Sequence, residues 1–190
     1  MKIEKDHMSI KNNGSKIRKI LIMGLDDAGK TSILLSLQRD TNLLSYCSLR
    51  PTQGRVIVSF QDRDTLFTVW DFGGQEQYRT DYFQHLDEYF IEVDKIFFVI
   101  DVQDTERYDL AFDYLKIIVE YLVKNSLKVD FTIFLHKFDP NLEDHPDFTE
   151  ERLSQTLFGK LKEIIPPNFT HDIFKTTIYT IFQKTPVTIR

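Results

Sequence analysis

The sequence contains a single cysteine, Cys47, among its 190 residues. One cysteine excludes an intramolecular disulfide framework and a zinc site built from several cysteines. Basic residues are also fewer than acidic residues: the sequence contains 24 Lys and Arg and 29 Asp and Glu, which gives a net charge of −5. This balance argues against a general nucleic-acid-binding protein, which normally presents a basic face.

Long hydrophobic runs are missing as well, and none approaches the ~20 residues that a membrane-spanning helix needs. The first residues lack the apolar centre of a secretory signal, position 2 is a lysine where myristoylation requires glycine, and the last residues contain no cysteine for prenylation. We therefore expect a cytoplasmic protein with no lipid anchor.

Glycine is scarce, with seven residues, whereas phenylalanine is abundant, with 16. We expect an aromatic-rich core and glycines only where the backbone requires them.

Residues 1–15 are polar and are expected to form a flexible segment ahead of one domain over residues 16–190. In that domain, short apolar runs alternate with stretches of helical periodicity. The expected strands are 17–23, 56–60, 66–70, 96–100, 131–135 and 172–176, and the expected helices are 30–38, 77–90, 108–122 and 150–164. Residues 40–54 are expected to be a loop.

This order of elements predicts an α/β fold with a mostly parallel six-stranded sheet and helices on both faces. The hairpin over residues 56–70 supplies one antiparallel edge strand. A C-terminal helix is expected to be short or incomplete, because few residues follow Thr177 and Pro186 is among them. A partner, or a longer chain of which this sequence is a fragment, would then cover the exposed sheet face.

The segment that follows the first strand reads GLDDAGKT, from Gly24 to Thr31. In a loop of this spacing the backbone N–H groups point at phosphate oxygens, and the helix that follows adds the positive end of its dipole. Lys30 is expected to reach the β- and γ-phosphates, and the Thr31 hydroxyl to coordinate Mg²⁺. The predicted phosphate-binding residues are Asp26, Asp27, Ala28, Gly29, Lys30, Thr31 and Ser32.

A carboxylate stands at the end of a later strand. Asp71 follows the apolar run 66–70, at the place where a second phosphate-site motif holds Mg²⁺, usually through water. Because ligands bind at the carboxyl ends of parallel strands, Asp71 and the glycine-rich loop are expected at the same rim of the sheet.

Five motifs in order resemble those of an Arf-like small GTPase of the Ras superfamily, over about residues 17–182. The first three are residues 24–32 (GLDDAGKTS), 51–54 (PTQG) and 68–76 (TVWDFGGQE). Residues 136–139 (HKFD) and 175–179 (KTTIY) are similar to the base-binding and fifth motifs in the form found in Rag GTPases. The resemblance implies the P-loop small GTPase fold, with GTP or GDP as ligand and Mg²⁺ as cofactor.

The resemblance also assigns roles near the phosphates. Thr52 would coordinate Mg²⁺ and sense the γ-phosphate, Gly74 would donate its backbone N–H to that phosphate, and Gln75 would orient the attacking water. The implied metal ligands are Thr31, Thr52 and, through water, Asp71. The implied catalytic residues are Gln75, Lys30 and Gly74.

At the base, Asp139 would accept hydrogen bonds from guanine N1–H and the exocyclic amino group, a pattern that adenine lacks. Lys137 would pack over the base, and the backbone N–H of Ile178 would face guanine O6. His136 replaces the asparagine that ties the base loop to the phosphate loop in the family that this sequence resembles, and we expect the choice of base to survive this replacement. The implied base-binding residues are His136, Lys137, Asp139, Thr177 and Ile178.

The function implied is a GTP-hydrolysing switch in which residues 40–54 (switch I) and 73–84 (switch II) order around the γ-phosphate. Hydrolysis is expected to be slow without a partner, because two carboxylates stand in the phosphate loop and the spacing of Arg50 and Arg55 does not match the cis arginine of Gα proteins. The alternative is a Rag-like, non-hydrolysing scaffold or dimerisation module. A P-loop ATPase or kinase is disfavoured by Asp139.

The expected partners are an exchange factor, an activating protein, and an effector or dimer partner that contacts the switches; nucleic acid is not expected. Aromatic residues follow the Gly73-Gly74 pair. Tyr78 and Tyr82 are expected on a partner-binding surface, whereas Phe83 and Phe90 are expected in the core.

Overall fold

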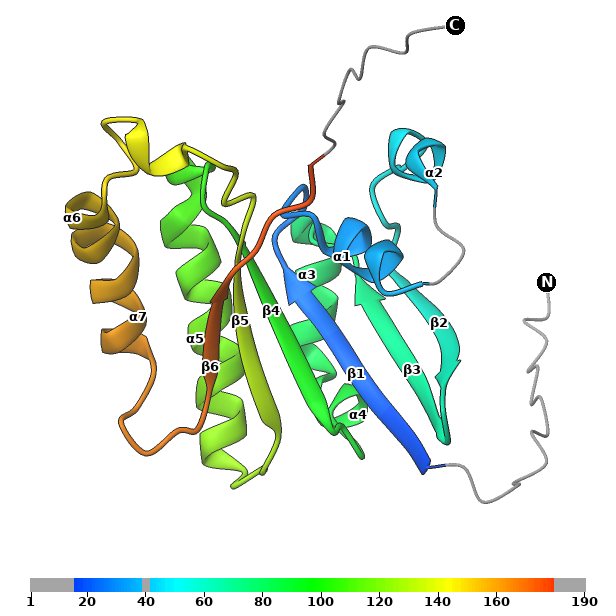
Figure 1. Cartoon of the computed structure of the whole chain (residues 1–190). Helices are drawn as coiled ribbons and strands as arrows, with labels where there is room; N and C mark the ends of the chain where they lie inside the picture. The colour runs from blue at the N-terminus through cyan, green and yellow to red at the C-terminus, as the bar shows by residue number, and fades with distance from the viewer. Residues whose placement is uncertain (1–15, 39–41, 180–190) are drawn as a thin grey trace, which may run out of the picture.

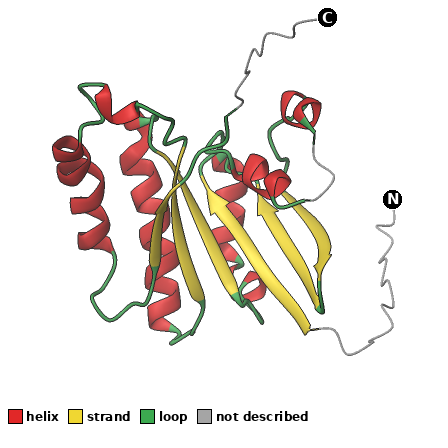
Figure 2. Cartoon of the chain, in the orientation of Figure 1, coloured by secondary structure: helices red, strands yellow, loops and turns green. Residues whose placement is uncertain are grey.

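The computed structural model describes residues 16–38 and 42–179, so the expected segment 1–15 lies outside the described residues. The strands are β1 (Lys16–Gly24), β2 (Arg55–Asp62), β3 (Thr65–Phe72), β4 (Lys95–Asp101), β5 (Asp130–His136) and β6 (Asp172–Lys175). The α-helices are α1 (Lys30–Ser36), α2 (Leu43–Cys47), α3 (Glu76–Gln84), α4 (Leu86–Tyr89), α5 (Tyr108–Lys124), α6 (Glu150–Leu153) and α7 (Gly159–Ile164) (Figures 1 and 2). Short 3₁₀ turns are η1 (Thr105–Arg107) and η2 (Leu142–Asp144), and a π-helical turn, η3 (Ser154–Phe158), joins α6 to α7.

The six strands form one sheet in the order β2-β3-β1-β4-β5-β6. All neighbouring pairs are parallel except β2 with β3, which are antiparallel. The predicted fold class is therefore confirmed. The central strand β1 is buried from Ile20 to Gly24, as expected for a parallel strand covered on both faces.

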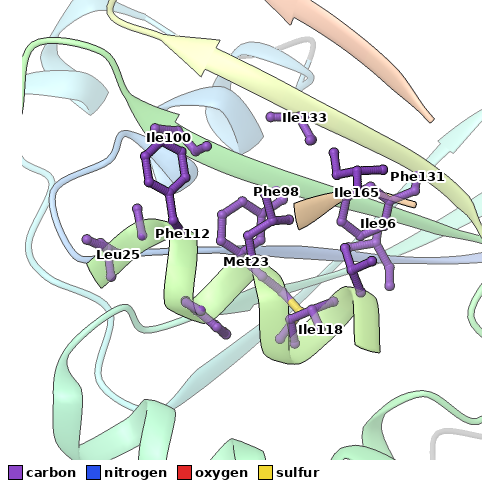
Figure 3. Packing of buried hydrophobic residues seen from close by; sticks show 14 of the residues in the cluster. Met23, Leu25, Ile96, Phe98, Ile100, Phe112, Ile118, Phe131, Ile133 and Ile165 are labelled. Carbon is purple, nitrogen blue, oxygen red and sulfur yellow. The ribbon is translucent and has the colours of Figure 1, made fainter. Parts of the chain in front are cut away.

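The larger part of the core lies between the sheet and helices α3, α5 and α7. Helix α5 contributes Phe112, Leu115 and Ile118, which are at most 5% exposed and pack against apolar residues of β1, β4 and β5 (Figure 3). The spacing of these three residues places them on one side of the helix. This packing fixes the strand ends from which the loops of the site emerge.

The opposite face of the sheet is covered by α1, through Ile33 and Leu34. Beyond α1, phenylalanines stand side by side on this face. The rings of Phe97 and Phe134 are stacked with centroids 4.8 Å apart, and Phe174 is 51% exposed at the sheet edge. Figure 1 shows α1 in front of the sheet and α5 behind it. The prediction of a short or incomplete C-terminal helix mostly concerns residues after 179, which lie outside the described residues.

Three expectations for local structure were wrong in detail. The expected loop 40–54 contains α2, which begins where the Asn42 side chain accepts a hydrogen bond from the Ser45 N–H, a frequent N-cap arrangement. The expected helix 77–90 is divided into α3 and α4, because His85 leaves the helical conformation at φ −128°. Helix α1 ends at Ser36, earlier than expected.

Tyr82 is also not the surface residue that was expected. Its side chain is 2% exposed, and its hydroxyl donates a hydrogen bond of 2.6 Å to the carbonyl oxygen of Gly54. Phe90 lies in the core as expected.

Within the described residues no helix combines the length and the apolar character needed to cross a bilayer.

Candidate functional site

The loop between β1 and α1 has the shape that its glycines predict. Gly24 and Gly29 have φ values of 141° and 86°, a region that side chains disfavour. A Cβ on Gly24 would lie 2.3 Å from the carbonyl oxygen of Val99 on the neighbouring strand. The loop therefore lies against the sheet and leads directly into the first turn of α1.

Lys30 is folded back into this loop. Its side chain is 5% exposed, and Nζ donates a hydrogen bond of 2.6 Å to the Leu25 carbonyl oxygen. Burial lowers the pKa of Lys30 to about 8, although Asp71 and Asp26 oppose this shift. An ammonium group in such a poorly hydrated place interacts strongly with any phosphate that enters the loop.

The three residues expected around a metal ion lie together. The Thr31 hydroxyl donates to Asp71 Oδ2 at 2.7 Å, the Thr52 hydroxyl donates to the same oxygen at 3.1 Å, and the two hydroxyl oxygens are 3.1 Å apart. Burial raises the pKa of Asp71. Switch I thus reaches the phosphate loop through Thr52.

These residues fit a magnesium ion. Asp71 Oδ1 is buried and has no hydrogen-bond partner in the described part of the chain, so this oxygen is available to a cation or its water. Hydroxyl and carboxylate oxygens are the ligands that Mg²⁺ prefers. The described residues hold no group of three His, Cys, Asp or Glu suited to a metal, which leaves this mixed set of oxygens as the candidate magnesium site.

A cavity of about 250 Å³ opens over the loop. Its lining residues are Asp26, Asp27, Gly29, Lys30, Thr31, Ser32, Leu49, Arg50, Pro51, Thr52, Gly74 and Gln75. Switch II approaches so closely that a Cβ on Gly74 would lie 2.0 Å from the Asp26 backbone nitrogen. Gly74 is held there by buried Arg79, whose Nη1 donates to the Gly74 carbonyl oxygen at 3.1 Å. The predicted phosphate, metal and catalytic residues, apart from buried Ala28 and Asp71, line this one cavity.

A second cavity, of about 720 Å³, adjoins the first, and both are lined by Gly29 and Ser32. Its other lining residues are Asn42, Leu43, Tyr46, His136, Lys137, Asp139, Ile178 and Tyr179. Of the predicted base-binding residues, all but Thr177 therefore line this cavity beside the phosphate loop, and Thr177 contacts it through its hydrogen bond to Asp139. Helix α2, which the sequence did not reveal, supplies Leu43 and Tyr46 to its rim.

The Asp139 carboxylate is held in position from both sides. Oδ1 accepts a hydrogen bond from the Thr177 hydroxyl, and Oδ2 accepts one of 2.9 Å from Gln103 Nε2. The same Gln103 nitrogen donates to the Lys137 carbonyl oxygen at 2.7 Å. Each carboxylate oxygen can accept more than one hydrogen bond, so a base can still bind Asp139.

His136 connects the two cavities in a way that its replacement of asparagine did not predict. The ring is 3% exposed, and Nδ1 lies 2.9 Å from the Thr176 hydroxyl oxygen. A Cβ on Gly29 would lie 2.4 Å from His136 Cδ2, so the ring edge rests on the phosphate loop. Burial and the neighbouring Lys137 lower the pKa of His136, which favours the neutral ring. The two loops thus remain tied, by packing.

Two basic residues, Arg107 and Lys137, lie next to the aspartates of the phosphate loop. Arg107 Nη1 lies 3.2 Å from Asp26 Oδ1, and Arg107 also pairs with Asp104. Lys137 Nζ lies 2.7 Å from Asp101 and 3.9 Å from Asp27. The negative charge that was expected to slow hydrolysis is therefore partly balanced. Sequence reasoning missed Arg107, Gln103 and Arg79, because none has a role in a motif of fixed spacing.

Comparison with known sequences gives a consistent result. The sequence profile of the ADP-ribosylation factor family matches residues 5–179. ADP-ribosylation factor-like protein 6 of Caenorhabditis elegans is 31% identical over 126 residues, which are 66% of this chain and 63% of the worm protein. ADP-ribosylation factor 3 of Arabidopsis thaliana is 36% identical over 139 residues, which are 72% of this chain and 70% of the plant protein. The chain thus spans slightly less than two thirds of the worm protein.

Solved structures show the same fold at lower identity. The Arl6 small GTPase from Trypanosoma brucei, determined with a bound nucleotide analogue, superposes with a TM-score of 0.63 at 21% identity, covering 85% of this chain and 87% of that chain. The mammalian SRP receptor superposes with a TM-score of 0.60 at 18% identity, covering 84% and 91% respectively. Both likenesses concern the fold alone.

Proposed function

The chain belongs to the ADP-ribosylation factor family of small GTPases, and on that premise we propose a guanine-nucleotide-dependent switch that binds GTP and GDP with Mg²⁺ and slowly hydrolyses GTP. One observation carries the proposal. Two adjoining cavities place Thr31, whose hydroxyl donates to Asp71, in one and the oriented carboxylate of Asp139 in the other. We assign the phosphate chain to the first cavity and the guanine base to the second.

Binding uses groups that are already in place. The loop from Asp26 to Gly29 presents backbone N–H groups, and Lys30 adds a buried positive charge. Mg²⁺, when bound, neutralises charge on the β- and γ-phosphate oxygens. Asp139 distinguishes guanine from adenine, because a carboxylate that faces adenine would lose its hydrogen-bond donors.

Hydrolysis requires a water positioned in line with the bond to be broken. Gln75 lines the phosphate cavity directly after Gly74, where its amide can orient that water. Gly74 brings its backbone to the phosphate loop, and Arg79 fixes its carbonyl oxygen. Switch I is linked to the same place through Thr52, so the conformation of both switches depends on whether the γ-phosphate is present.

The proposed function is tested by the nucleotide that the protein carries. Purified chain is expected to release GDP or GTP on denaturation, and unlabelled GTP is expected to displace a labelled GTP analogue much more effectively than ATP does. Equal displacement by ATP and GTP would contradict guanine specificity. Regulators and effectors that act through the switches follow from the family, whose match does not favour the Rag-like scaffold.

Replacement of Gln75 by leucine is expected to suppress hydrolysis while GTP binding is preserved. Leucine has a similar size but cannot orient water, and the side chain makes no contact with the base cavity. Single-turnover hydrolysis and equilibrium binding of the variant measure the two properties separately. Gln84→Leu, an exposed glutamine at the end of α3 that lines neither cavity, is the matched control. An unchanged hydrolysis rate in Gln75→Leu would remove Gln75 from the mechanism.

A further inference from the structure

Arg50 lies in switch I, between α2 and β2, and lines the phosphate cavity. The same cavity is lined by Lys30, Thr52 and Gln75, which the proposed function places around the γ-phosphate. Arg50 also lines a neighbouring cavity of about 360 Å³ between α1 and β2. The residue therefore stands at the wall where switch I faces the phosphates.

The cations around this site differ in whether they already have a partner. Four donate to a carbonyl or carboxylate oxygen of the protein, and these are Lys30, Arg79, Arg107 and Lys137. Arg50 makes no hydrogen bond or ion pair with the residues that the structure describes. An exposed guanidinium at the rim of a phosphate cavity, with its five donors unengaged, is suited to bind phosphate oxygens.

The backbone around Arg50 restricts where its side chain can go. Pro51 fixes its own φ and favours an extended conformation for the residue before it. Thr52 is anchored to Thr31 and Asp71 through its hydroxyl. Arg50 is therefore two residues from a fixed point beside the magnesium site. When Thr52 leaves that point, Arg50 must move with it.

We propose that Arg50 is a catalytic residue that contacts the γ-phosphate and supplies, from within the chain, positive charge to the transition state of GTP hydrolysis. This inference rests on the proposed function. In the step, the water oxygen forms a bond to the γ-phosphorus, and the bond from that phosphorus to the bridging oxygen of GDP breaks. Both protons of the water leave with inorganic phosphate, as H₂PO₄⁻, and Arg50 keeps its own protons throughout.

Arg50 would act where negative charge accumulates on the γ-phosphoryl and bridging oxygens. An arginine placed in this way contributes about 10³–10⁵ in rate in other GTPases, and those that carry it in cis still turn over at only about 10⁻² s⁻¹. The slow hydrolysis of the proposed function therefore stands, and the expectation that Arg50 has no such role is revised. The spacing of Arg50 in the sequence did not predict this role, because spacing does not report which side chains line a cavity. When Thr52 is anchored to Thr31 and Asp71, Arg50 is therefore also placed beside the phosphate cavity. The catalytic site is complete only in this state of switch I.

The experiment compares Arg50→Ala with wild type and with Arg55→Ala. Arg55 is the matched control, because it is an exposed arginine near the same switch whose guanidinium stacks on the rings of Trp70 and Tyr89, 4.3 and 5.0 Å from their centroids, outside the phosphate cavity. We expect Arg50→Ala to slow single-turnover hydrolysis by about 10³-fold, the low end of the range above. Binding of GDP is expected to change by less than about fivefold, and Arg55→Ala to hydrolyse at the wild-type rate.

A second readout is the binding of GDP with aluminium fluoride, which mimics the transferring phosphoryl group. Wild type is expected to form this complex without a partner protein, and Arg50→Ala to lose it while still binding GDP. An unchanged hydrolysis rate and an unchanged aluminium fluoride complex in Arg50→Ala would overturn the inference. A loss of GDP affinity as large as the loss of hydrolysis rate would also overturn it, because that result indicates a role in binding. A wild-type chain that binds no GTP would instead overturn the proposed function, before any variant is compared.

Discussion

Replacement of Lys30 by alanine is expected to weaken binding of both GTP and GDP by about 10²-fold or more. Hydrogen bonds to charged groups are worth about 1.5–3 kcal/mol each, and two such contacts to phosphate correspond to a factor of 10² to 10⁴. The effect is large here because Lys30 is 5% exposed, so water replaces little of what is lost. The variant also leaves the Leu25 carbonyl oxygen without its 2.6 Å partner.

Calorimetric titration of nucleotide into the nucleotide-free variant measures this loss. Lys160→Ala is the matched control, because Lys160 lies on α7 and pairs with Glu163 in an exposed position. Thermal unfolding of both variants shows whether Lys30→Ala is still folded. Equal affinity of wild type and a folded Lys30→Ala for GTP would refute the phosphate-loop assignment.

Replacement of Asp139 by asparagine is expected to exchange guanine specificity for xanthine specificity. A site built to hydrogen-bond one ligand can reject an analogue by about 10⁴–10⁵. Asparagine keeps one acceptor and adds a donor, which matches the carbonyl group that xanthine has in place of the guanine amino group. Gln103 can still donate to the remaining oxygen of the new amide, and the Thr177 hydroxyl, which donates to the carboxylate, can instead accept from the amide NH2, so the amide should remain near the carboxylate's position.

Competition between GTP and xanthosine triphosphate for the variant is the measurement, with Asp144→Asn as control. Asp144 is an exposed carboxylate in η2, in the same loop. We expect the control to keep the wild-type preference for GTP. If Asp139→Asn still prefers GTP and ignores xanthosine triphosphate, the base lies elsewhere and the second cavity has another ligand.

The sequence predicted those parts of the fold and site that depend on local patterns. Strand β1 could be predicted because a run of apolar residues ends at a glycine, and α5 because its apolar residues recur on one face. The glycine-rich loop followed from its spacing, and Asp71 from its place at a strand end. Such features are encoded by neighbours in the chain, so no long-range contact is needed to predict them.

Features that depend on distant contacts could not be predicted. Arg107 reaches Asp26 across 81 positions of sequence, and Gln103 reaches Asp139 across 36, and nothing local marks either side chain. Tyr82 looked exposed because it follows a Gly-Gly pair, yet a hydrogen bond to Gly54, 28 residues away, accompanies its burial. Helix α2 depends on a cap at Asn42 in a polar stretch where apolar periodicity is too weak to indicate a helix.

The contact between His136 and Gly29 has a consequence for how this sequence can evolve. The two positions are far apart in the chain, yet a single methyl group on residue 29 would collide with the imidazole at 2.4 Å. Any lineage that gains a side chain at position 29 must therefore reduce position 136 as well, and a φ of 86° penalises even that double change. Position 136 is likewise limited in size, because a ring longer than imidazole would displace the phosphate loop. Related sequences should show the two positions varying together, with glycine at 29 wherever an aromatic ring occupies 136.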